Sequence, residues 1–135
     1  MTTQLRNRYA FLRAQGEAAT RALSLARSEE LLDRAQSEGV ATVEWLDDDF
    51  PYEHGFYSDD EIRAKFASNE WTGPYYCVVT AGDAVASLGG IVVGPRNLND
   101  PYCRVVEAEL AAEIETDLRE TLSDALDSRT LCPAL

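Results

Sequence analysis

The stretch from residue 100 to residue 127 constrains the fold of this 135-residue chain more than any other. Asp100 is a candidate N-cap, and Pro101 suits the first helical position, where a missing N–H costs nothing. Apolar residues then recur at helical spacing, at Leu110, Ile114, Leu118, Leu122 and Leu126. At about 100° per residue their side chains form one band, which a globular domain must bury. The sequence therefore predicts a long amphipathic helix over residues 100–127.

The opposite side of this predicted helix carries a row of acidic residues. Its members are Glu109, Glu113, Asp117, Glu120, Asp124 and Asp127. At about 1.5 Å of rise per residue the row spans roughly 27 Å, within an arc of roughly 80°. Solvated helix faces usually mix acids with Lys at i,i+4, whereas a row of one sign repels itself. The row is therefore either a solvated face or a contact surface for a basic partner.

Three β-prone runs in the middle of the chain predict an antiparallel sheet. They lie at residues 40–46, 75–80 and 84–93. Gly82-Asp83 suits a two-residue hairpin turn, and the Gly89-Gly90 pair indicates a bulge in the last strand. We expect an α+β fold in which a three-stranded meander is packed by long N- and C-terminal helices.

Capping and turn residues divide the rest of the chain. Ser58 caps a short helix that ends before Asn69, and Thr72-Gly73-Pro74 predicts a turn. Helical spacing extends over residues 4–27, and Ser28 then begins either a second helix or the kinked continuation of the first. The single expected domain thus has four segments, at residues 1–39, 40–99, 100–127 and 128–135, of which the last is a tail.

Charge narrows the classes of partner. The chain has a net charge of −12, which disfavours direct contact with nucleic acid or anionic membranes and favours basic partners. Residues 1–27 carry +4 and the remainder −16, so we expect the N-terminal helix to dock on an acidic surface or to exchange between the two chains of a homodimer. No signal peptide, disulfide framework or membrane span is recognisable, which predicts a cytoplasmic location.

Two groups of residues are alternatives to the acidic row. Oxygen-rich side chains in the loop after the first strand predict a hard-metal site at Asp47, Asp49, Glu53 and His54. Aromatic and cationic side chains predict a pocket for a small anionic ligand at Trp45, Tyr75, Arg96 and Arg104. Cys103 falls in the first turn of the acidic helix, where the helix dipole lowers the pKa of a thiol. Because the sequence offers it no base partner, a buried or half-buried structural role is favoured.

Part of the sequence resembles a group of phage proteins. The residues that carry the resemblance are Val85-Ala86-Ser87-Leu88-Gly89-Gly90-Ile91, Asp100-Pro101-Tyr102 and the following residues 104–111. Val43-Glu44-Trp45 with Asp47-Asp48 is similar too. Together these segments, about half the chain, resemble small acidic proteins encoded by actinobacterial phages. That group has no assigned activity, so the resemblance implies only a phage product in the host cytoplasm that acts on a host component.

These observations favour a non-enzymatic binding protein. Its acidic row would engage a basic host protein, such as one that handles nucleic acid, and would inhibit that protein by imitating phosphate charge. The alternative is a protein that binds or sequesters an anionic metabolite or nucleotide. A metal-dependent enzyme is the third hypothesis, and no cofactor is expected.

Overall fold

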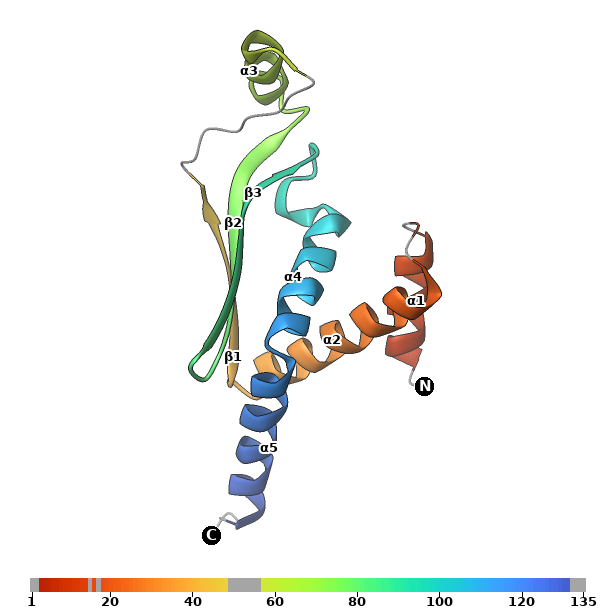
Figure 1. Cartoon of the computed structure of the whole chain (residues 1–135), viewed down its shortest axis with the longest axis vertical. Coiled ribbons are helices and arrows are strands. Elements are labelled where there is room, and N and C mark those ends of the chain that lie inside the picture. Colours follow the sequence, from red (N-terminus) through yellow and green to blue (C-terminus); the bar gives the residue numbers. More distant parts are fainter. Residues whose placement is uncertain (1–2, 15, 17, 49–56, 132–135) are drawn as a thin grey trace.

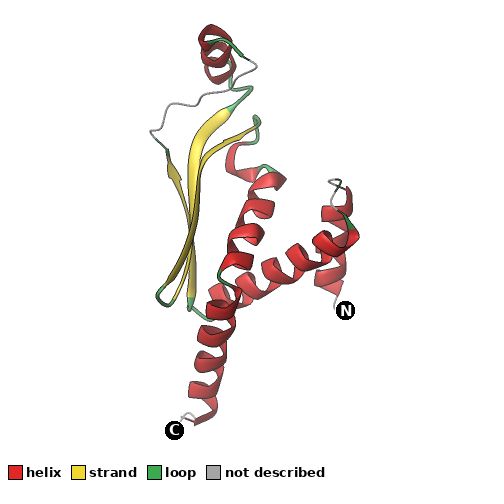
Figure 2. Cartoon of the chain, viewed as in Figure 1, coloured by secondary structure: helices red, strands yellow, loops and turns green. Residues whose placement is uncertain are grey.

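A three-stranded sheet and a set of helices on one of its faces make up the protein (Figure 1). This computed structural model describes residues 3–14, 16, 18–48 and 57–131. The strands form an antiparallel meander in the order β1-β2-β3, which confirms the predicted α+β fold class. Figure 2 shows that the helices other than α3 gather on one side of the sheet, so one sheet face carries the core.

The sheet follows the β-prone runs of the sequence. Its strands are β1 (Ala41–Asp47), β2 (Thr72–Ala81) and β3 (Ala84–Val93). The predicted hairpin is confirmed, because Ala81 pairs with Ala84 across the two-residue turn. The predicted turn at Thr72-Gly73-Pro74 is wrong: these residues belong to β2, and the peptide bond before Pro74 is cis. Pro74 lies near the start of the central strand, where the register with β3 shifts between Thr72 and Tyr75, and a proline is tolerated at such an irregularity.

The bulge predicted in β3 is also confirmed. Between the paired residues of β2 and β3, both Gly89 and Gly90 fall opposite Tyr76. The backbone N–H of Gly90 donates to Asp48 Oδ2 at 2.7 Å, so the residue after β1 is bonded to the bulge. A Cβ on Gly89 would lie only 2.8 Å from the same oxygen, so a larger residue there would require the Asp48 side chain to shift.

The main core lies between the sheet and the helices. α4 (Pro101–Glu113) and α2 (Ala19–Ser37) contribute Val106, Leu110 and Leu32, which pack over the inward side chains of β2 and β3. α5 (Glu115–Leu131) adds Leu118 and Leu122. Leu110, Leu118 and Leu122 come from the predicted apolar band. Alternation on β2, where Cys77, Val79 and Ala81 are buried, places every second side chain in the same core.

The acidic segment is two helices and not one. Asp100 caps α4 as predicted, its side chain accepting a hydrogen bond from the Tyr102 N–H at 2.9 Å. A short 3₁₀ helix, η1 (Asn97–Asn99), precedes the cap. Ile114 separates α4 from α5, with φ −114° and ψ 28°, and its N–H bonds to the Ala111 carbonyl only three residues back. The expected end at residue 127 and the tail from 128 are also wrong, because α5 continues to Leu131.

The N-terminal segment forms a helical hairpin whose break differs from the expected one. α1 (Thr3–Ala14) ends before Gly16, which has φ +89° and donates its N–H to the Arg13 carbonyl. A left-handed residue ends a helix, and glycine adopts that conformation without steric cost. Ser28 does not begin a helix: it is only 3% exposed and lies inside α2. Its burial against neighbouring elements overrides its capping preference.

Two smaller features complete the fold. α1 contributes Leu12 to a second cluster that includes Leu25 of α2 and Val105 of α4. Near the far end of the sheet, α3 (Asp59–Ala67) is capped by Ser58, as expected, and Lys65 Nζ lies 5.1–5.2 Å from the ring centroids of Tyr57 and Trp71. Among the described residues, no helix has the length and apolar character needed to cross a membrane.

Candidate interaction surface

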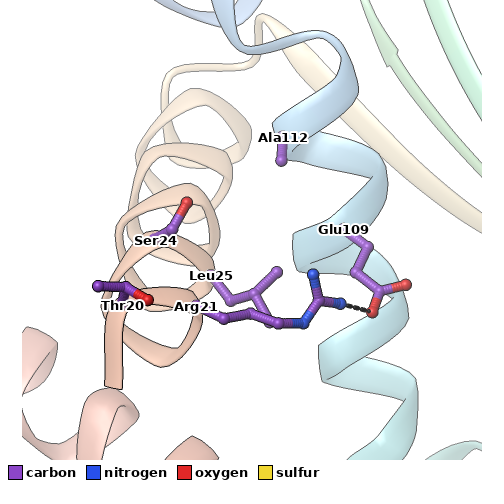
Figure 3. A pocket seen from close by; sticks show the side chains of 6 residues that line it. All are labelled: Thr20, Arg21, Ser24, Leu25, Glu109 and Ala112. Carbon is purple, nitrogen blue, oxygen red and sulfur yellow. Dashed lines mark hydrogen bonds and ion pairs between the residues drawn. The ribbon is translucent and has the colours of Figure 1, made fainter. Parts of the chain in front are cut away.

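The structure separates Glu109 from the rest of the acidic row. Glu109 belongs to α4 and forms an ion pair with Arg21 of α2, across the groove drawn in Figure 3. That groove has a volume of about 570 Å³, and Thr20 and Ser24 also line it. Both partners are partly exposed, so the pair contributes little to stability. Its main consequence is that Arg21 of α2 neutralises this one carboxylate.

The other five members lie on the end of α4 and along α5, and we call them the acidic surface. They are Glu113, Asp117, Glu120, Asp124 and Asp127. Asp117 is half-buried and the other four are exposed. Within the part of the chain that the structure describes, none of the five forms an ion pair.

Basic side chains near the acidic surface are few and are placed to one side of it. Arg119 of α5 pairs with Glu115 at 2.8 Å, one helical turn back on the same helix. Asp127 borders a groove between α2 and α5 that Arg34 and Arg119 also line. The negative charge of the acidic surface is therefore least compensated from Glu113 to Asp124. Arginine side chains lie closer to it towards the end of α5.

The Arg-rich N-terminal hairpin does not cover the acidic surface. Arg8 of α1 pairs with Glu29 and Asp33, both on α2, and so serves to hold the hairpin together. Arg21 reaches Glu109, on α4. The expectation that the basic segment docks on acidic residues is met within the protein, but at carboxylates outside the acidic surface.

Three of the four residues of the expected ligand pocket bond to other side chains of the protein. Trp45 Nε1 donates to Glu107 Oε2 at 2.7 Å, and Arg104 Nη2 lies 2.8 Å from the same oxygen. The Tyr75 hydroxyl donates to the side chain of Asn97 in η1. Arg96 is exposed next to Asn97. Two of the four thus share one carboxylate, while the other two lie around η1.

Glu107 is the charged residue that sequence reasoning missed. It is 7% exposed and bonds both Trp45 and Arg104, so it ties β1 to α4. A signal was present, because Glu107 precedes Leu110, Ala111 and Ile114 at helical spacing and so lies in the apolar band. An acid at such a position must find partners on burial.

A second carboxyl, Glu29 of α2, lies in the electrostatic range of Glu107. Burial raises the pKa of Glu29, Arg8 counteracts the rise, and the nearby charge of Glu107 adds to it. Arg8 also has a buried atom, Nη1, without a hydrogen-bond partner. Charged groups of α1, α2 and α4 therefore influence one another around Glu29.

The two described cysteines are structural. Cys77 on β2 and Cys103 on α4 are free thiols with no exposed surface. Burial raises the pKa of Cys77 to about 12 and also raises the pKa of Cys103, where Arg104 acts in the opposite direction. The favoured expectation, that Cys103 is a buried structural residue, is confirmed, and removal from water outweighs the effect of the helix dipole on its pKa.

Most of the expected metal loop lies outside the described residues. This applies to Asp49, Glu53 and His54, whereas Asp47 is the exposed last residue of β1. Across the described ranges, no three His, Cys, Asp or Glu side chains come together in a way that could hold a metal ion.

Comparisons with known proteins add no constraint on this surface. No family model, curated protein or solved structure matches the chain.

Proposed function

We propose that this protein binds a basic protein partner through the acidic surface and that it has no catalytic role. One observation carries the proposal: the five carboxylates have no ion pair within the described residues, although the chain has arginines that it uses elsewhere. A protein that only needed solubility would be served by mixed charges on this helix. Unpaired carboxylates of one sign raise the association rate with a positive patch.

The position of α5 supports the proposal. α5 extends past the end of the sheet, so that only one of its sides faces the rest of the chain (Figure 1). Leu118 and Leu122 occupy that side and are buried in the core. The carboxylates are thereby held on a helix whose orientation is fixed by packing, which lowers the entropy lost on binding.

The chemistry of the partner follows from the spacing of the charges. From Asp117 to Asp127 the acidic surface extends about 15 Å at the rise of an α-helix, with carboxylates on successive turns. A nucleic-acid strand presents phosphates at a comparable linear density. A host protein that handles nucleic acid would offer a matching groove, and occupation of that groove would inhibit it. The interruption at Ile114 limits the imitation to α5 and the last residue of α4.

The small-ligand alternative has less support. Trp45, Arg104 and Tyr75 already bond to side chains of the protein, so a ligand would have to displace those bonds. Ligand pockets usually keep their polar groups directed at open space. The acidic surface needs no such rearrangement.

Affinity capture from an actinobacterial lysate tests the proposal. Immobilised protein should retain a basic protein at about 0.05 M salt and lose most of it at about 0.3 M, since screening weakens contacts between exposed charges. The variant E113K/D117K/E120K should lose that protein at both salt concentrations. The matched control E44K/D59K/D60K changes the net charge equally, at exposed residues of β1 and α3.

The control decides the outcome. Equal loss in both triple variants would mean that only net charge matters, and undiminished capture by the acidic-surface variant would refute the proposal. Circular dichroism and chemical denaturation of all three proteins establish that the fold is intact.

A further inference from the structure

The two edges of the sheet differ in charge. The free edge of β1 carries Glu44 and Asp47, and Asp48 follows directly. The free edge of β3 carries none: residues 84–95 form an uncharged run in a chain whose charged residues make up 27%. Charges and prolines within edge strands are the usual means of preventing strand addition. β1 has that protection, and β3 lacks it up to its bulge.

The turn geometry determines which backbone groups β3 leaves at its free edge. In a two-residue hairpin the residues that flank the turn bond to each other, here Ala81 and Ala84. Because bonding alternates along an antiparallel strand, Ala86 also bonds towards β2. The N–H and C=O groups of Val85 and Ser87 therefore point away from the sheet. No element of the described chain pairs with that edge.

Exposed apolar side chains accompany these backbone groups. Val85 is 61% exposed on the open face of the sheet, and Leu88 is 42% exposed at the last residue before the bulge. Both lie on the uncharged strand. An edge that combines unpaired backbone groups with exposed apolar side chains is a template for another strand.

We propose that β3 pairs antiparallel with β3 of a second copy of this chain, across a twofold axis at Ala86. In this register Val85 lies opposite Ser87 of the second copy, and the reverse holds across the axis. The two residues whose backbone groups face outward are thus the two that meet, and each pair exchanges both of its hydrogen bonds. Leu88 comes to lie opposite Ala84 of the second copy. The two sheets become one continuous sheet of two copies.

Charge permits a second copy as the occupant. Two chains of net charge −12 repel each other, and the uncharged β3 edge is where their close approach costs least. A twofold axis also makes the edge its own complement, since antiparallel pairing is symmetric. The bulge ends the pairing after Leu88, so the contact is short and the dimer should dissociate in the micromolar range.

Sedimentation of the full chain tests the pairing. Between about 1 and 200 µM the mass should rise from 14.9 kDa towards twice that value. V85K/S87K should raise the dissociation constant at least tenfold, because it places ammonium groups opposite each other. The matched control T42K/L46K makes the same types of change on the open face of β1, and it should leave the dimer intact. Both variants reduce the net negative charge equally, so general repulsion cannot account for a difference.

Each alternative outcome overturns the proposal. A wild-type protein that stays monomeric throughout excludes self-pairing, and leaves an edge for some other strand. Equal dissociation by both variants would place the contact on the open face of the sheet and not on the edge of β3. Hydrogen exchange on the wild-type protein tests the pairing without any substitution. The amides of Val85 and Ser87 should be protected at high concentration and should exchange on dilution.

Discussion

α4 and α5 carry the same alternation of apolar and acidic residues, yet their carboxylates have different fates. α4 lies between the sheet and α2, so Glu107 is buried under Trp45 and Arg104, and Glu109 is paired with Arg21. α5 faces the rest of the chain on one side only, and its carboxylates stay unpaired within the described residues apart from Glu115. The comparison teaches that the neighbours of a helix decide whether an acid stabilises the fold or remains available to a partner.

The largest expected effect concerns the apolar side that both helices share. Leu118 has no exposed surface, so Leu118→Ala should lower the free energy of unfolding by about 2–5 kcal/mol through lost burial and a residual cavity. Urea denaturation measures the loss. A loss below about 1 kcal/mol would mean that α5 is packed far more loosely than α4.

The buried carboxylate of α4 should come next. Glu107→Ala leaves Trp45 Nε1 and Arg104 without their shared acceptor, and should cost about 1–3 kcal/mol. Trp45→Phe keeps the ring and removes only one donor, so it should cost less. Denaturation followed by tryptophan fluorescence compares the two variants. Equal stability of Glu107→Ala and wild type would remove the distinction between α4 and α5.

A smaller effect on stability should come from Glu29 of α2, and it should depend on pH. Burial raises its pKa above the ordinary value of 4.5, so the folded protein holds this proton more tightly than the unfolded chain does. That contribution to stability is present at low pH and is lost as the pH rises through the raised pKa. The stability of wild type relative to Glu29→Gln should therefore increase as the pH falls from neutral towards 4.5. Parallel pH profiles for the two proteins would contradict this assignment.

The smallest effect belongs to the acidic surface. Glu113→Ala and Asp117→Ala should each change the free energy of unfolding by about a few tenths of a kcal/mol or less, in the stabilising direction, because they relieve like-charge repulsion. Glu109→Ala serves as the comparison on α4, where loss of the Arg21 pair should be neutral or slightly destabilising. Clear destabilisation by Asp117→Ala would show that the acidic surface has a structural role.

Periodicity predicted most of the helices and strands. Rules based on neighbouring residues failed where contacts with residues far away in the sequence determine the local structure. The three strands, the hairpin turn, the bulge and the Asp100 cap each follow from a few neighbouring residues. The interruption at Ile114 has no such marker, since residues 111–115 include neither glycine nor proline. Ser28 carries a capping signal, but it is buried inside α2.

The candidate site was predictable to a different extent. The row of acids was visible in the sequence, because helical spacing alone puts those residues on one side. Which acids remain unpaired was not visible, because Arg21 and Glu109 are 88 residues apart in the chain. The Glu107 cluster likewise joins β1 and α4 through a contact 62 residues apart, which periodicity cannot predict.

The cluster beside α3 has a practical consequence for labelling chemistry. Lys65 is the single lysine of the chain, and its ammonium group lies against Tyr57 and Trp71 while it also pairs with Glu70. An acylating reagent therefore meets one side-chain amine, and that amine reacts only in its uncharged form. Because the ammonium group is held against the two rings and the Glu70 carboxylate, the rate of acylation should report how often Lys65 leaves these contacts. A fluorophore attached there would also lie far from both α5 and the hairpin turn of β3, and would leave both proposed contacts free (Figure 1).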